Sequence, residues 1–367
     1  MALSLRSPLD RPELGLAAVA VLALLAFPFY MNVYYQFVVV SAAFLGIFAA
    51  TYDFFSGLTG YFSFAHMVLV GLGGYTSTIL AQAHGLPLFA AIVLATVITT
   101  VVGLVVIGIP SLRLSGLYFV IITVVIASLA TKLVVLFSDW TGGSDGYLLV
   151  PDLLSEIEPL VPIELTEELL TYYLAVGLLV AVTGLLVLFA KSRFGIVLLS
   201  MRQDETLLES IGIDPVKYRL VGFGITCLVT GFAAAVWTHT LTSLNPGSHV
   251  AFARMIDIII AMVLGGAGTI VGPVVGVFGL EAFDELLVFV DGETGLLAGI
   301  DLELGVIQEL VSMGLVLVFI YRVPDGAYPL VKRKLYAVKE DGPSTLWEPS
   351  VDRARSLFST LADRLSR

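Results

Sequence analysis

The chain has 367 residues, of which 58% are hydrophobic and only 13% are charged. A soluble domain needs about a quarter of its residues charged to cover its surface, so most of this surface must face lipid. The net charge of −11 argues against nucleic acid as a partner, because nucleic acid selects basic surfaces. We interpret the acidic excess as a haloarchaeal-like, salt-tolerant surface, with an ordinary acidic membrane protein as the alternative.

The apolar runs predict an all-α polytopic membrane protein with about ten transmembrane helices. The runs Leu88–Ile109 and Tyr172–Ala190 contain no charged residue, and a bilayer core needs roughly 20 such residues as a helix. A β-barrel would show short alternating segments instead. The predicted spans, in chain order, are 14–31, 35–55, 63–82, 88–109, 116–137, 171–190, 219–241, 254–271, 273–290 and 304–321. We expect a transmembrane domain over residues 1–321 and a tail over 322–367.

The distribution of charge between the spans predicts their orientation, because Lys and Arg stay preferentially in the cytoplasm. The segment 191–219 is basic, as is the tail, whereas the segment 139–170 has eight acidic residues and neither Lys nor Arg. We therefore predict a multi-pass protein of the cell membrane with both termini in the cytoplasm. The tail end, Val351–Arg367, has apolar residues at helical spacing and predicts an amphipathic helix. We expect it to lie on the membrane, with docking on a partner subunit as the alternative.

No motif for covalent chemistry or metal binding is present in the sequence. It has neither a G-x-x-x-x-G-K-[ST] phosphate loop nor an H-E-x-x-H pair, and its four histidines are scattered. The single cysteine, Cys227, lies in an apolar run and is interpreted as core filler. A polytopic protein of this kind is expected to be a conduit that is not an enzyme and binds no cofactor.

The basic segment 191–219 contains a predicted docking helix. Asp204–Ile211 has a helical apolar pattern, Gly212 supplies a helix stop, and Asp214 with Pro215 supplies a turn before the next span. A short helix with an apolar knob among acidic residues suits insertion into a groove of another protein. A simple amphipathic connector is the alternative.

Five segments in this order resemble the LivM-type permease subunit of branched-chain amino-acid ABC importers. They are the basic segment that starts at KSRFG, GLTGYFSFAHMVLVGLGGYT at Gly57–Thr76, PSLRLSGLYFVIIT at Pro110–Thr123, WTGGSDGY at Trp140–Tyr147 and MVLGGAGTIVGPVVG at Met262–Gly276. The sequence departs from the family pattern at Asp53, where Asn is common, and at Leu207-Leu208, where an Ala pair is common.

The resemblance implies the ABC-importer permease fold, with Gly-rich broken elements, and a division of labour between subunits. Two ATPase subunits, a second related permease and an extracytoplasmic solute-binding protein are the implied partners, and ATP hydrolysis belongs to the ATPases. The residues it implies for coupling to the ATPases are Asp204, Glu205, Leu207, Leu208, Glu209, Gly212 and Pro215.

Small residues and intramembrane polar residues mark a candidate translocation pathway. Glycines let helices approach closely and let the backbone break around a pathway, although tight packing explains them equally well. Ionisable residues inside spans usually face a cavity or a partner, and Arg254 is placed to pair with Asp257. The candidates are Asp53, Gly57, Thr59, Gly60, His66, Gly74, Tyr75, Asp257, Gly265, Gly266 and Gly268.

Three alternatives to an amino-acid importer remain at this stage. A closely similar permease could carry urea or short amides. A proton-coupled secondary carrier could use Asp53 or His66 as its proton site, but it leaves the docking helix without a role. A scaffold without flux is disfavoured by the number of spans and the paired Gly-rich elements.

Overall fold

The computed structural model describes residues 11–112, 114, 116–160, 166–294, 313–314, 318–319, 321–323 and 326–341. The regular structure of these residues is helical, with one isolated antiparallel bridge between Tyr147 and Leu244. The helices are α1 (Arg11–Ala26), α2 (Val33–Tyr52), α3 (His66–Gln82), α4 (Leu88–Val102), α5 (Ile109–Leu112), α6 (Leu117–Leu136), α7 (Ser138–Thr141), α8 (Leu153–Ile157), α9 (Glu167–Lys191), α10 (Arg193–Met201), α11 (Glu205–Ser210), α12 (Pro215–Leu241), α13 (Pro246–His249), α14 (Phe252–Gly265), α15 (Val271–Thr294) and α17 (Ala327–Asp341).

Two of the long helices continue into wider π-helical turns. These turns cover Asp53–Gly57 after α2 and Gly103–Gly108 after α4, and short 3-10 turns cover Phe27–Phe29 and Glu158–Leu160. A π-turn widens the backbone spiral, and such turns are often found at functional sites.

Six helices of the described part are long and apolar enough to cross a membrane, which makes the chain a multi-pass membrane protein. The predicted all-α class is confirmed, but the predicted count of about ten spans is not. A helix occupies each predicted range from 14–31 to 273–290. Helices α1 and α3 have 16 and 17 residues, short of a full crossing. The last predicted span, 304–321, lies almost wholly outside the described residues, as does the tail helix at 351–367.

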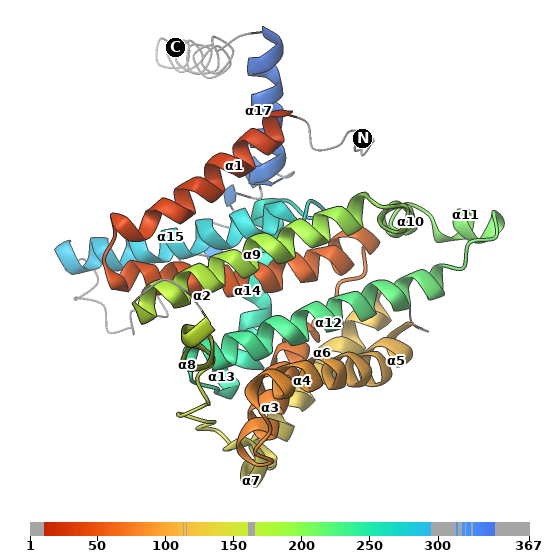
Figure 1. Ribbon diagram of the computed structural model, residues 1–367. Helices are drawn as coiled ribbons and strands as arrows, with labels where there is room; N and C mark the ends of the chain where they lie inside the picture. The colour runs from red at the N-terminus through yellow and green to blue at the C-terminus, as the bar shows by residue number, and fades with distance from the viewer. Residues whose placement is uncertain are drawn as a thin grey trace, which may run out of the picture.

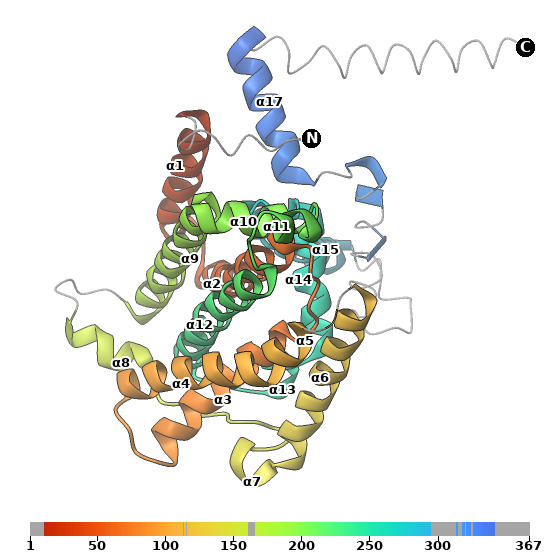
Figure 2. The same cartoon turned by 90° about the vertical axis from the view of Figure 1, so that its right-hand side faces the viewer.

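Helix α12 lies at the centre of the bundle. It packs against α2, α3 and α4, while α2 in turn packs against α9 and α15, and α14 packs against α15. Figure 1 shows the long helices α2, α9, α12 and α15 running side by side, with α10 and α11 gathered at one end. Figure 2 looks toward that end, where α10 and α11 lie in front of the ends of α2 and α12.

Helix α6 forms an outer wall of the bundle. Its side chains Leu117, Ile121, Val125 and Leu129 are apolar and exposed. A soluble protein rarely exposes an apolar face of this extent, because water penalises it. A lipid-facing wall is the physical explanation for this exposed apolar face.

Side-chain caps define where several helices begin. Asn32 accepts the amide of Tyr35 at the start of α2, and Ser192 accepts the amide of Gly195 at the start of α10. Each cap pairs a backbone N–H that the first helical turn leaves without a partner.

Candidate functional site

The buried carboxylate of Asp53 joins the two Gly-rich segments of the chain. It follows α2 in the first turn of the π-helix and accepts hydrogen bonds from the amides of Gly268 at 2.6 Å and Ile270 at 2.7 Å. These two amides belong to the loop between α14 and α15, which we call the hinge loop (residues 266–270). Asp53 therefore fixes this loop against the end of α2.

The glycines at this junction leave room for the two backbones to meet. A Cβ atom on Gly57 would clash with the Asp53 carboxylate and lie 2.7 Å from the amide nitrogen of Gly268. Gly268 itself has a φ of +82° and Gly266 a φ of +114°, which side-chain-bearing residues rarely adopt. Gly265 approaches the carbonyl of Gly272 at the other end of the loop.

Arg202 ties the same junction to the segment that was predicted to dock. It lies just after α10, and its Nη1 donates to the carbonyl of Gly57 at 2.8 Å. Its side chain also covers the two neighbouring glycines, since a Cβ on Gly60 would lie 3.1 Å from Arg202 Cγ and one on Gly268 3.2 Å from Nη1. Sequence analysis counted Arg202 only as an orienting charge. A lone cation beside a helix break was the signal that could have pointed to it.

The predicted docking helix is present as α11, and its start and stop are as expected. Asp204 accepts the amide of Leu207 at 3.2 Å, and Asp214 accepts the amide of Val216 at 3.0 Å, with Pro215 as the first residue of α12. Gly212 has a φ of +80°, as a helix-ending glycine requires.

Helix α11 has an exposed face and a face held against the bundle. Leu207 and Ile211 are 63% and 66% exposed, whereas Leu208 is 7% exposed and packs into the core. Glu209 is also exposed. Only the exposed face is accessible to another protein. Leu207 lies on this face and Leu208 lies on the buried one, a difference that sequence analysis did not detect.

Glu205 anchors the inner face of α11. It forms an ion pair with the buried Arg219 of α12 and accepts a hydrogen bond from the Tyr61 hydroxyl at 3.2 Å. The Arg219 guanidinium lies 3.9 Å from the centre of the Tyr61 ring, a cation–π contact. Tyr61 belongs to the segment that follows the π-turn at Asp53–Gly57. Glu205 therefore connects α11 to that segment.

The remaining candidates from the first Gly-rich motif lie in different surroundings. His66 Nε2 lies 3.3 Å from the Thr51 hydroxyl, which also accepts a hydrogen bond from Thr230 at 3.2 Å. Thr59 donates to the carbonyl of Phe55 at 2.7 Å, a local contact within the helix end.

Three further candidates lie apart from the hinge loop. Gly74 lets α3 approach Thr238, and Tyr75 packs in a separate cluster with Leu244 and Val250. Asp257 lies near the start of α14 and pairs with Arg254 at 3.4 Å, the pairing that the sequence predicted.

The structure thus brings Asp53, Gly57, Gly60 and the hinge loop together, with Arg202 added. No group of three or more His, Cys, Asp or Glu residues that could hold a metal ion is found among the described residues. The site has the form of a mechanical junction between helix ends.

Comparison with known proteins places the chain in a family. The family model described as branched-chain amino acid transport system / permease component matches residues 34–324. The LivM high-affinity branched-chain amino acid transport system permease protein of Salmonella typhimurium strain LT2 is 26% identical over 233 residues, 58% of this chain and 54% of that protein. LivM of Escherichia coli K12 is 25% identical with the same coverage.

The chain spans about half the length of the curated relatives it matches. No solved structure matches it at a significant level.

Proposed function

The chain belongs to the family of branched-chain amino acid transport system permease components, and on that premise we propose that it is the membrane-spanning subunit of an ATP-driven importer for branched-chain or related amino acids. Members of this family are transport subunits and not enzymes. ATP hydrolysis is assigned to two partner ATPase subunits. A second related permease completes the path, and a solute-binding protein delivers the cargo.

The observation that supports this proposal most is the contact between α11 and the segment that follows the π-turn of the Gly-rich junction. The exposed residues Leu207 and Ile211 form the docking face for an ATPase groove, with Glu209 at its side. Behind this face, Glu205 contacts Tyr61 and Arg219. The motion of an ATPase would in this way reach the Gly-rich junction, and a two-state gate needs such a connection.

The assignment of regions and sides follows from the same proposal. The segment 191–219 is the coupling loop and faces the cytoplasm, with both termini on that side. Residues 1–321 form the permease domain and 322–367 a cytoplasmic tail. Asp204, Gly212 and Pro215 shape the coupling loop by starting and ending its helices.

Asp53 acts in this proposal as a holder of the hinge loop and not as a proton carrier. Both of its oxygens accept backbone amides of the hinge loop, and the side chain is fully buried, so the carboxyl group is not in contact with solvent in this state. A proton-coupled secondary carrier is for this reason the weaker hypothesis.

The test is solute uptake into proteoliposomes that contain this chain with its neighbouring permease, ATPases and binding protein. We expect labelled leucine to accumulate only when ATP is present on the side of the membrane to which the ATPase subunits bind. Accumulation of labelled urea in place of leucine would support an ATP-driven importer with urea as its substrate. Uptake that continues without ATP and follows a proton gradient would overturn the proposal.

A further inference from the structure

Helix α17 runs across the direction of the long helices. Figure 1 shows it rising away from α9 and α15, and Figure 2, in which the view is turned toward the end of the long helices, shows it pointing outward from the bundle as well. Its contacts within the bundle are with α15, α14 and α1. A helix that crosses the spanning helices in this way lies along the plane of the membrane.

The base of α17 rests on the hinge loop. Gly326, the residue before α17, has a φ of +86° and donates its amide to the carbonyl of Val323 at 3.0 Å. A Cβ atom on Gly326 would lie 2.5 Å from the Cα and the amide nitrogen of Gly266 and 2.9 Å from the carbonyl carbon of Gly265. Glycine permits this approach of two backbones because it has no side chain. The position of α17 is therefore tied to the hinge loop, which Asp53 in turn holds.

The start of α17 lies near the end of the bundle that carries the coupling loop. The hinge loop is bound at the end of α2, where Arg202 of the coupling loop also reaches the carbonyl of Gly57. Tyr321 and Arg322, shortly before α17, are both exposed. Tyr is enriched at membrane–water interfaces and Arg on the cytoplasmic side. In the proposed orientation, α17 therefore begins at the cytoplasmic surface of the membrane.

Helix α17 is basic although the chain is acidic. The protein has a net charge of −11, yet α17 contains four cations, Lys332, Arg333, Lys334 and Lys339, and its two acidic residues come only at its end. Arg333 and Lys334 are exposed. A local cluster of this sign attracts an anionic partner, because like charges repel and opposite charges attract.

An apolar line accompanies these cations along the helix. Val331 is 41% exposed, and Leu335 and Val338 follow it at the i+4 and i+7 spacing of one helical face. A helix of 15 residues with this charge is too short and too polar to cross a bilayer. Exposed cations beside an apolar line suit the headgroup region of a bilayer, where phosphate groups and hydrocarbon are both within reach.

We propose that α17 binds the anionic phosphate headgroups of the cytoplasmic membrane surface and, through Gly326, holds the hinge loop in its observed position. Arg333 and Lys334 contact the phosphate groups, and Val331 enters the layer beneath them. Loss of anionic lipid releases α17 and with it the hinge loop. Helix α17 lies beyond residue 324, where the match to the permease family ends.

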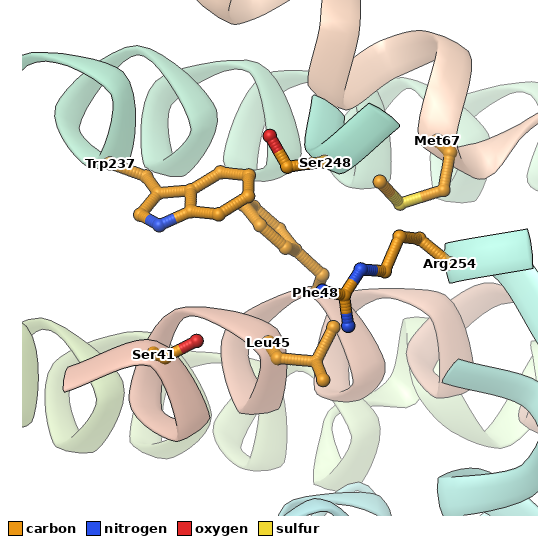
Figure 3. Close-up of a pocket in the computed structure, with 7 residues that line it drawn as sticks. All are labelled: Ser41, Leu45, Phe48, Met67, Trp237, Ser248 and Arg254. Atoms are coloured by element: carbon orange, nitrogen blue, oxygen red, sulfur yellow. The ribbon is translucent and has the colours of Figure 1, made fainter. Parts of the chain in front are cut away.

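The cavity shown in Figure 3 does not suit such a headgroup. Arg254, the cation in its lining, pairs with Asp257 at 3.4 Å. The volume of the cavity is about 40 Å³, which corresponds to roughly three water molecules at ~10–15 Å³ each. A lipid phosphate group with its glycerol needs more space than this. The exposed cations of α17 have no such restriction.

A fluorescent probe on α17 measures the lipid contact. Val331→Cys provides the attachment site for the environment-sensitive dye NBD, because the native cysteine, Cys227, is buried. The full chain is reconstituted in nanodiscs of phosphatidylcholine, with or without phosphatidylglycerol. We expect the emission to move to shorter wavelength only with phosphatidylglycerol, and high salt should reverse the change. Equal emission in the two lipids would overturn the proposal.

Charge variants show whether the cations of α17 cause the response. Arg333→Gln with Lys334→Gln should remove most of the emission shift, because each cation near an anionic surface adds to binding. Arg193→Gln with Lys217→Gln makes the same change of charge at exposed positions of the coupling loop and should leave the shift unchanged. A shift that survives the loss of both α17 cations, or that needs added ATPase subunits in place of phosphatidylglycerol, would show that the lipid surface is the wrong partner.

Hydrogen–deuterium exchange of the hinge loop tests the connection to α17. The amides of Gly268 and Ile270 are bonded to Asp53, so their exchange reports opening of the junction. We expect phosphatidylglycerol to slow this exchange in the wild type but not in the Arg333→Gln/Lys334→Gln variant. A probe shift without any change in wild-type hinge-loop exchange would show that α17 binds lipid without holding the loop, and this part of the proposal would be wrong.

Gly326→Ala separates lipid binding from the contact with the hinge loop. Its Cβ would push α17 away from Gly266, so the probe should still respond to phosphatidylglycerol whereas hinge-loop exchange should not. Gly85→Ala is the matched control, because Gly85 also has a positive φ, +63°, but nothing lies within 4 Å of its added Cβ. It should keep both responses. None of these measurements uses transport, so their outcome is independent of whether the importer and its cargo are as proposed.

Discussion

At the scale of single residues, the junction depends on a carboxylate whose two oxygens each accept a backbone amide and on a glycine that leaves space for it. Asp53 accepts two amides of the hinge loop, and Gly57 lies against both the carboxylate and Gly268. Removing either feature affects contacts between segments that lie 215 residues apart in the chain. Substitutions at Asp53 or Gly57 should therefore lower both the stability of the protein and its transport activity.

The substitution Gly57→Ala should therefore destabilise the protein. Its Cβ would meet the Asp53 carboxylate and the backbone of Gly268, and overpacking of this kind costs about 1–3 kcal/mol. We expect a lower unfolding temperature in detergent and reduced uptake. Gly184→Ala in α9 is the matched control, because nothing lies within 4 Å of its added Cβ. An unchanged unfolding temperature for Gly57→Ala would contradict the tight junction.

The helix cap at Asp204 predicts a pH dependence of α11. Hydrogen bonds from Thr206 and from the amide of Leu207 hold the pKa of the Asp204 carboxyl below its usual value. A carboxyl with a lowered folded-state pKa contributes its full stabilisation above the unfolded-state pKa of about 3.9, and that contribution is lost as pH falls through the folded-state pKa. The cap should be intact at neutral pH and lost only in acid.

Hydrogen–deuterium exchange of α11 in the wild type and in Asp204→Asn measures this directly. Asn can also cap a helix but does not titrate. At each pH the two proteins are compared with one another, which removes the intrinsic pH dependence of exchange. The wild type should lose protection relative to Asp204→Asn only at acid pH. Loss of protection between pH 7 and 6 would show that another group controls the helix.

At the scale of elements, α11 combines an exposed face, which we propose as the docking face, with an anchored face within six residues. The contrast between adjacent leucines is the clearest consequence, because Leu207 is exposed and Leu208 is buried. Two substitutions of the same kind should therefore fail for different reasons.

Leu207→Asp should leave stability within about 0.5 kcal/mol, as surface changes usually do, but should abolish assembly with the ATPase subunits. Leu208→Asp places a carboxylate against the core and should lower the unfolding temperature strongly. Thermal unfolding and co-purification of the ATPases distinguish the two. Normal co-purification with Leu207→Asp would remove the exposed face of α11 from the docking surface.

At the scale of the whole molecule, the arrangement places the coupling loop and the segment 139–160 at different ends of the bundle. Figure 1 shows α11 at one end of the long helices and α7 and α8 away from it. Together with the charge pattern, this predicts that the coupling loop is cytoplasmic and the acidic segment external.

Cysteine labelling in intact cells tests this orientation. The wild type is the control, because its one cysteine, Cys227, is buried and should not react. A membrane-impermeant maleimide should label Ser144→Cys from outside but should label Ser210→Cys only after the membrane is opened. Both positions are exposed. The reverse labelling pattern would invert the proposed topology.

Much of the architecture could be predicted from the sequence. Hydrophobic runs placed most helices, and the local pattern Asp204, Gly212, Asp214-Pro215 located α11 with its boundaries. The Arg254–Asp257 pair followed from helical spacing alone. The predicted count of about ten membrane spans is not confirmed, because the length and charge content of α1, α3 and α15 fall outside what a simple crossing requires and the range 304–321 lies largely outside the described residues.

Sequence analysis identified only part of the candidate site. Its glycines and Asp53 were singled out, but their joint geometry was not, and Arg202 was missed. A small cavity that is lined by residues of α2, α3, α12, α13 and α14 was missed as well, since its lining comes from five helices. Nothing in the local pattern of Ser41 or Trp237 distinguishes them from other residues of apolar helices.

The sequence by itself determined that this is a helical membrane protein with a short capped helix between two spans, because composition, periodicity and helix caps act over a few residues, and its motifs carried the resemblance to the permease family. Only the tertiary structure decided that Asp53 holds the hinge loop, that Arg202 reaches Gly57, and that Glu205 faces inward. These contacts join residues far apart in the chain. They depend on how the helices pack, and helix packing is a long-range property that no local pattern specifies.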